Sequence, residues 1–128
     1  MSLLAKLIRW GLEFFGKADE DFDRAVEALC REQSELPPIT RNELARALED
    51  LAKRKPENKD ELTQLQAELF ALGERIEKSE VCDQVPHEVW HFLFDADIRF
   101  KEQDYAASQL QTLHDCILEL KSVHGKHP

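Results

Sequence analysis

The sequence predicts an all-α protein on three observations. Glycine and proline are scarce, with four and five residues in 128, too few for the many turns of a β-sandwich or barrel. Apolar residues recur every three or four positions, which is the period of an amphipathic helix. Capping signals stand ahead of several of these segments. We therefore expect one domain over residues 1–128, a bundle of about five or six helices built from antiparallel helical hairpins.

The first 17 residues have the pattern of an amphipathic helix with a wide apolar face. Its large apolar residues include Leu7, Trp10 and Phe14, and Gly16 can end it. Three basic residues against one acidic residue make the segment positively charged. Such a face can pack into a core, bind a partner or lie on a membrane surface, and we expect Leu7, Trp10 and Phe14 to contribute to partner binding.

The second helix is expected to start after Asp19, which can cap it. Acidic residues follow at once and suit the positive end of a helix dipole. The apolar residues Phe22, Val26 and Leu29 keep the helical spacing. The helix should end before the Pro37-Pro38 pair.

The third helix has the clearest predicted start in the chain. Thr40 and Glu43 have the spacing of a capping box, which places the first helical residue at Arg41. Its apolar positions recur at helical spacing until a basic turn, Lys53-Arg54-Lys55, and Pro56 then prevents its continuation.

The fourth helix repeats this logic with Asn58 as the cap and Glu61 three residues later. It carries an apolar seam with alternating spacings of three and four, made of Leu62, Leu65, Leu69, Leu72 and Ile76. Because the link from the third helix is short, we expect the two to form an antiparallel hairpin packed like a short coiled coil.

A fifth helix is expected from Pro86 through about Lys101, since proline is favoured in a first helical turn. Asp104 can cap a sixth, which again carries one apolar seam. Residues 124–128 should form a frayed tail.

The string His-Glu-x-x-His in the fifth helix is the sequence's one candidate for chemistry. It would place His87 and His91 on one helix face as zinc ligands, with Glu88 as the general base for a zinc-bound water. A catalytic zinc also needs a third protein ligand and an open position, and no second motif supplies that ligand. A zinc-dependent hydrolase is therefore the alternative function, and the simpler interpretation is two partly exposed histidines near a helix start.

A second apolar arc on the fifth helix predicts a docking surface. Trp90, Phe94 and Ile98 lie together on a helical projection, apart from the main core face, and aromatic residues are favoured in interfaces. Asp97 projects into the apolar sector of the same helix. It is therefore expected to be a buried acid, either paired with a cation or available for proton transfer.

The net charge and the number of cysteines limit the classes of function and the cellular location that the sequence predicts. A formal net charge of −9 argues against nucleic-acid binding, which needs a basic face. Three widely spaced cysteines predict reduced thiols and a cytoplasmic location, and no apolar run predicts an export signal or a membrane span.

We therefore expect a non-enzymatic adaptor or regulator that binds a protein partner or a second copy of itself and needs no cofactor. The zinc hydrolase is one alternative, and a helical module held on a membrane surface by residues 1–17 is another.

Overall fold

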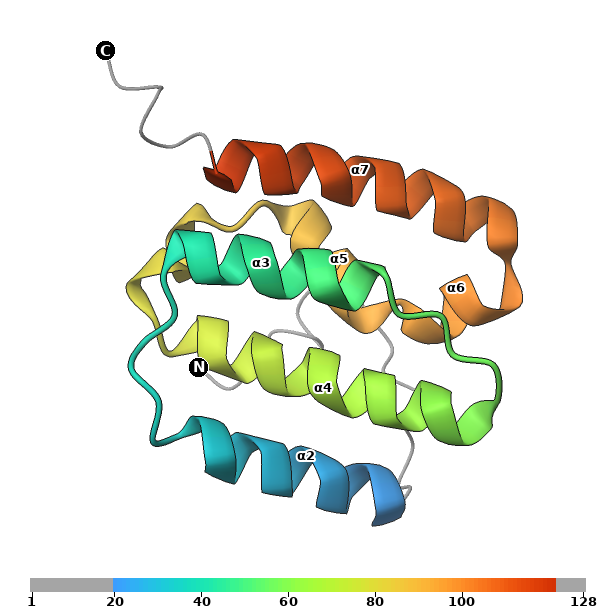
Figure 1. The fold of residues 1–128 in the computed structure, drawn as a ribbon, viewed down its shortest axis with the longest axis horizontal. Helices are drawn as coiled ribbons and strands as arrows, with labels where there is room; N and C mark the ends of the chain where they lie inside the picture. Colours follow the sequence, from blue (N-terminus) through green and yellow to red (C-terminus); the bar gives the residue numbers. More distant parts are fainter. Residues whose placement is uncertain (1–19, 122–128) are drawn as a thin grey trace.

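The computed structural model describes residues 20–121, and this range is helical with no strand (Figure 1). The elements in chain order are α2 (Glu20–Gln33), α3 (Arg41–Ala52), α4 (Lys59–Glu77), a 3-10 helix η1 (Glu80–Gln84), α5 (His87–Phe94), α6 (Ala96–Lys101) and α7 (Gln103–Lys121). The all-α prediction is confirmed for this part of the chain. The expected helix over residues 1–17, with Leu7, Trp10 and Phe14, and the tail over 124–128 lie outside the described residues.

The predicted caps form as the sequence indicates. The Thr40 hydroxyl accepts a hydrogen bond from the Glu43 amide (3.2 Å), and the Glu43 carboxylate accepts one from the Thr40 amide (3.0 Å). Asn58 caps α4 by accepting from the Glu61 amide at 2.9 Å. These side chains satisfy amides that have no partner inside their own helix, so the starts of α3 and α4 follow from local sequence.

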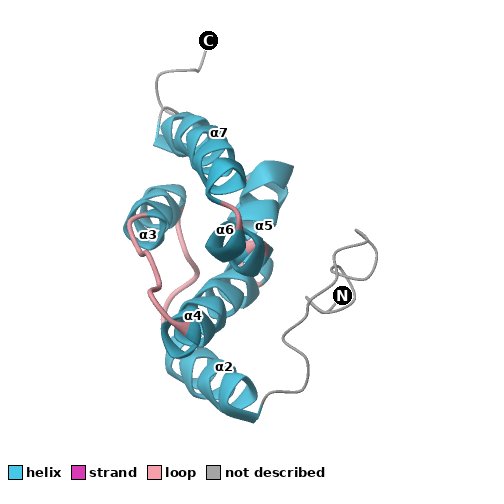
Figure 2. Ribbon diagram, turned by 90° about the vertical axis from the view of Figure 1, so that its right-hand side faces the viewer, coloured by secondary structure: helices cyan, strands magenta, loops and turns pink. Residues whose placement is uncertain are grey.

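The closest helix pairs differ from the expected hairpin of α3 and α4. These two helices run in opposite directions (Figure 1), but α4 packs mainly against α2, and α3 packs mainly against α7. Figure 2 shows α4 between α2 and the remaining helices. The fully buried Ala67 and Ala71 explain the contact with α2, because small side chains let a second helix approach closely.

The prediction of one continuous helix from Pro86 to Lys101 is wrong in one respect. The structure has two helices there, α5 and α6, with a break at Asp95. In an unbroken helix the Phe92 carbonyl would accept from the Ala96 amide. Here it accepts from the Arg99 guanidinium at 2.7 Å. The Arg99 side chain of the following helix thus replaces the Ala96 amide as the hydrogen-bond donor to the Phe92 carbonyl. Asp95 lies at the corner between the two helices.

The core is built around α4 and α5. Leucines of both α3 and α4 are buried in this core. The largest of its fully buried side chains is Phe92 on α5. α5 is apolar on nearly every side, and five of its eight residues are buried: Val89, Trp90, Phe92, Leu93 and Phe94. A helix of this composition must lie inside a protein. The corner at Asp95 is consequently held within the core.

Candidate functional site

Asp95 is the centre of a polar network at the edge of this core, in which Asp95 and Gln109 are buried and Tyr105 is 36% exposed. The exposure of Asp95 is only 6%, and one carboxylate oxygen, Oδ2, accepts two hydrogen bonds from α7. The Tyr105 hydroxyl donates at 2.6 Å and the Gln109 side-chain amide at 3.1 Å. These bonds satisfy a buried charge that would otherwise be costly, and they join the corner between α5 and α6 to α7.

Arg99 completes the network from α6. Its Nη1 donates to the Phe92 carbonyl and to the side-chain oxygen of Gln109, while its guanidinium lies 4.1 Å from the centre of the Phe92 ring. Gln109 therefore bridges Arg99 and Asp95 by donating to Asp95 and accepting from Arg99. The network connects three helices through four polar side chains.

Two residues of the network have shifted pKa values, and burial is the largest cause of both shifts. Burial lowers the pKa of Arg99 to about 10, although the negative charge of Asp95 acts in the opposite direction. Burial, followed by the hydrogen bond to Asp95, raises the pKa of Tyr105 to about 12. At neutral pH the guanidinium is therefore charged and the phenol is neutral, so the phenol can donate to Asp95.

The titration of Tyr105 tests this geometry directly, because it is the only tyrosine in the chain. Its phenolate should appear in the near-ultraviolet absorbance at about pH 12 rather than at the ordinary value of 10.0. Since the folded protein holds this proton more tightly, the associated stabilisation is complete below pH 10 and is lost as the pH rises toward 12.

Asp95→Asn should lower the Tyr105 pKa part of the way toward 10.0, because it removes the carboxylate's effect but not the burial. Asp97→Asn is the matched control, since Asp97 has no hydrogen bond to Tyr105, and it should leave the titration unchanged. Circular dichroism at each pH verifies that the chain is still folded. A wild-type phenol that titrates at its ordinary pKa would contradict the network.

A groove opens beside this network, between the end of α3, α6 and the first half of α7. We call it the α3–α6–α7 groove; its volume is about 420 Å³. Its lining is mostly apolar and includes Leu51, Phe92, Phe100, Ala107 and Leu110. Volumes of this order accommodate a small ligand or one or two side chains of a bound segment.

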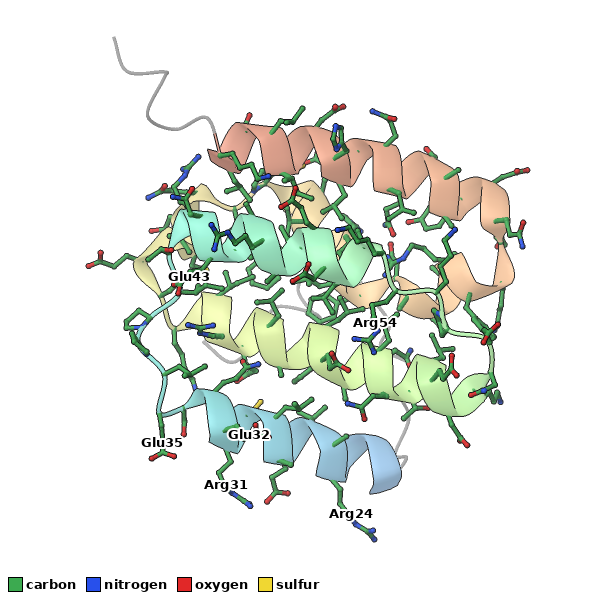
Figure 3. The ribbon with its side chains drawn as sticks, in the orientation of Figure 1. Arg24, Arg31, Glu32, Glu35, Glu43 and Arg54 are labelled. Carbon is green, nitrogen blue, oxygen red and sulfur yellow. The ribbon has the colours of Figure 1, made fainter. Side chains whose placement is uncertain are left out.

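The polar part of the groove lining contains three cations: Arg54, Lys55 and Arg99. Arg54 projects from the end of α3 toward α4 (Figure 3), where both of its terminal nitrogens bond the Glu68 carboxylate at 2.8 and 3.0 Å. Lys55 is exposed. Because Arg54 is paired with Glu68, the cations of this edge that form no ion pair with another described residue are Lys55 and Arg99. The groove thus combines an apolar floor with a cationic edge in a chain of net charge −9.

The residues of the His-Glu-x-x-His string lie at the start of α5. The rings of His87 and His91 are edge to face with their centres 4.6 Å apart, and Glu88 is exposed. His91 Nδ1 lies 3.8 Å from Asp95 Oδ2, which links the string to the buried network. Within residues 20–121, the histidine, cysteine and acidic side chains form no group of three that could hold a metal ion.

The docking stripe predicted on the fifth helix is mostly buried. Trp90 is 3% exposed and Phe94 7%, and their rings stack at 6.3 Å. The prediction that these two side chains are available to a partner is wrong, because α5 is covered by its neighbours on both apolar arcs. Ile98, at 38% exposure, is the member of the stripe that remains accessible.

The buried acid is Asp95 rather than Asp97, which is only half-buried. A continuous helical projection put Asp97 among apolar residues, but the break at Asp95 changes the rotation of α6 relative to α5. The prediction of Asp97 as the buried acid is therefore wrong.

The sequence pattern did not single out Arg99, Tyr105 and Gln109 as members of a site. The available signal was Tyr105 and Gln109 four residues apart on one helix face.

Comparison with known proteins gives no relative, since no family model, curated protein or solved structure matches this chain. Within the described range, no helix has the length and apolar character needed to cross a membrane. Function is therefore inferred from the groove and the network beside it.

Proposed function

We propose that this chain is a non-enzymatic binding module that receives a short segment of a protein partner in the α3–α6–α7 groove. The observation that carries the proposal is an apolar groove with a cationic edge on an otherwise acidic protein. Charge complementarity commits the occupant to a segment that carries both apolar and acidic residues. A cytoplasmic location, in keeping with the free thiols of Cys30, Cys82 and Cys116, belongs to the same proposal.

The lining favours insertion of a side chain into the groove. Leu51, Phe100 and Leu110 are only partly buried although they border the core, so an inserted apolar group would remove more of their surface from water. Binding energy in protein interfaces is concentrated at such points, where one large side chain fills a pocket. Ala106 and Ala107 on α7 leave room for it.

The polar network beside the α3–α6–α7 groove favours a groove that is already formed in the free protein. The network of Asp95, Arg99, Tyr105 and Gln109 fixes α6 against α7, and these two helices form one side of the groove. A groove held open in the free protein costs less to organise when a partner binds.

The test is a display selection of random linear peptides on the immobilised full-length chain. Enriched peptides should combine a large apolar residue with aspartate or glutamate. Ala107→Trp fills the groove and should weaken the enriched peptides at least about tenfold, or about 1.4 kcal/mol.

Ser108→Trp is the matched control, since Ser108 is exposed on α7 and does not line the groove. It adds the same indole one position away and should leave peptide affinity unchanged. Peptides that bind both tryptophan variants as well as the wild type would overturn the proposal, as would a selection with no enrichment.

A further inference from the structure

Arg99 has hydrogen-bonding capacity that the network does not use. Both of its hydrogen bonds come from Nη1, which donates to Phe92 and Gln109. Within the described residues, Nε and Nη2 have no hydrogen-bond partner, and Arg99 lines the α3–α6–α7 groove. A guanidinium presents its donors as a planar fork that matches the two oxygens of a carboxylate. Arg99, which lines the groove, therefore has an unused donor edge of the right shape for one.

Asp95 does not occupy this edge. Its Oδ2 is bonded by Tyr105 and Gln109 from α7, and it reaches Arg99 only through the Gln109 bridge. Asp97, two residues before Arg99, likewise makes no hydrogen bond to it, although its negative charge is close enough to act on the guanidinium. These neighbours moderate the charge of Arg99, but no carboxylate of residues 20–121 forms a direct ion pair with it.

Burial also makes the charge of Arg99 costly, and its pKa is lowered because the neighbouring groups, Asp95 foremost, compensate only part of that cost. A carboxylate that enters the groove would exclude further water and supply the missing compensation. Charge-assisted bonds of this kind are stronger than neutral ones. Lys55 at the groove edge adds attraction of the same sign.

We propose that the bound segment places a carboxylate on the Nε and Nη2 edge of Arg99 while a neighbouring apolar group occupies the groove floor beside Phe100 and Leu110. This assignment rests on the proposed function and makes Arg99 the specificity-determining residue of the groove. The carboxylate can belong to an acidic side chain or to the chain terminus, and both carry the same chemistry.

A pair of small probes tests the assignment without a partner. Hexanoate and hexanamide share the same apolar tail. Hexanoate ends in a negatively charged carboxylate, whereas hexanamide ends in a neutral amide. In nitrogen-labelled full-length protein, hexanoate should shift the Arg99 side-chain signal and the Ala107 amide. Hexanamide should need at least about a tenfold higher concentration for the same shifts. This comparison uses the wild-type protein, so it does not depend on whether an Arg99 variant folds.

Variants then assign the effect to Arg99. Arg99→Met should remove most of the preference for hexanoate over hexanamide, leaving only the weaker attraction of Lys55. Arg99→Lys, which keeps the charge but not the fork, should retain more of the preference than Arg99→Met. Lys101→Met is the control, because Lys101 is an exposed cation on the same helix that does not line the groove. It should leave the preference unchanged.

Peptides distinguish the two sources of the carboxylate and separate this inference from the proposed function. Peptides enriched in the selection are compared with forms whose acidic side chains are replaced by amides and with forms whose terminus is amidated. The form that loses affinity identifies the source. If enriched peptides remain sensitive to Ala107→Trp while neither replacement weakens them, the carboxylate assignment is overturned and the groove function stands. Equal binding of hexanoate and hexanamide would overturn it too.

Discussion

Phe92→Ala is expected to lower the free energy of unfolding by about 3–5 kcal/mol, the cost of truncating a fully buried phenylalanine. Phe92 is 1% exposed and is the largest fully buried side chain. Its removal leaves a cavity in the core beside the α3–α6–α7 groove, whose lining includes Phe92. It also removes the ring beneath Arg99, whose guanidinium lies 4.1 Å from its centre.

Urea unfolding followed by circular dichroism measures this loss. Leu118→Ala is the matched control, because Leu118 is an apolar residue of α7 that is 51% exposed and lies outside the core. It should change stability by less than about 0.5 kcal/mol. If the two substitutions had similar effects, the central place of α5 in the core would be contradicted.

Asp95→Ala is expected to lower the free energy of unfolding by about 2–3 kcal/mol, because it removes the acceptor shared by two donors. The Tyr105 hydroxyl and the Gln109 amide would lose their bonds to it, and Arg99 would lose the carboxylate that most offsets its burial. The corner between α5 and α6 would lose its connection to α7. The cost should therefore exceed that of truncating an ordinary surface acid.

The same unfolding measurement on Asp97→Ala supplies the comparison. Asp97 is two residues away and half-buried, but it forms no hydrogen bond or ion pair with another described residue. We expect less than about 1 kcal/mol for this control, because Asp97 acts on Arg99 only through its charge and makes no hydrogen bond to it. If Asp97→Ala cost as much as Asp95→Ala, the network would not be what holds the corner.

The parts of the fold that follow from sequence are those governed by neighbouring residues. The starts of α3 and α4 were predicted because Thr40 with Glu43, and Asn58 with Glu61, satisfy amides within three residues of themselves. The end of α2 ahead of the two prolines is equally local. These interactions do not require knowledge of any other helix.

The break at Asp95 and the packing of α2 on α4 could not be predicted in this way. Residues 86–101 have a continuous helical pattern, and the break depends on Arg99 bonding the Phe92 carbonyl and on α7 bonding Asp95. Ala67 and Ala71 have the spacing of one helix face, but nothing in the sequence indicates that α2 packs against α4. Both the break at Asp95 and the packing of α2 on α4 depend on contacts between residues far apart in the sequence. The spacing of apolar residues within one helix does not indicate such contacts.

The candidate site was predicted least well for the same reason. The prediction that Trp90 and Phe94 bind a partner assumes that α5 has a single core face, whereas both of its apolar arcs are buried. Arg99 falls on a polar arc of the projection, as expected for a surface residue, but the corner turns it inward against Phe92. Only the error at Arg99 comes from projecting one straight helix across residues 86–101, since Trp90 and Phe94 lie within α5 before the break.

Mapping an enriched peptide on the labelled protein tests the central claim most directly. Amide shifts should concentrate on Leu51, Ala106, Ala107 and Leu110 around the α3–α6–α7 groove, and the Arg99 side-chain signal should move with them. Shifts confined to the start of α5 around His87 and His91, or to the Leu118 side of α7, with the groove residues unchanged, would contradict it.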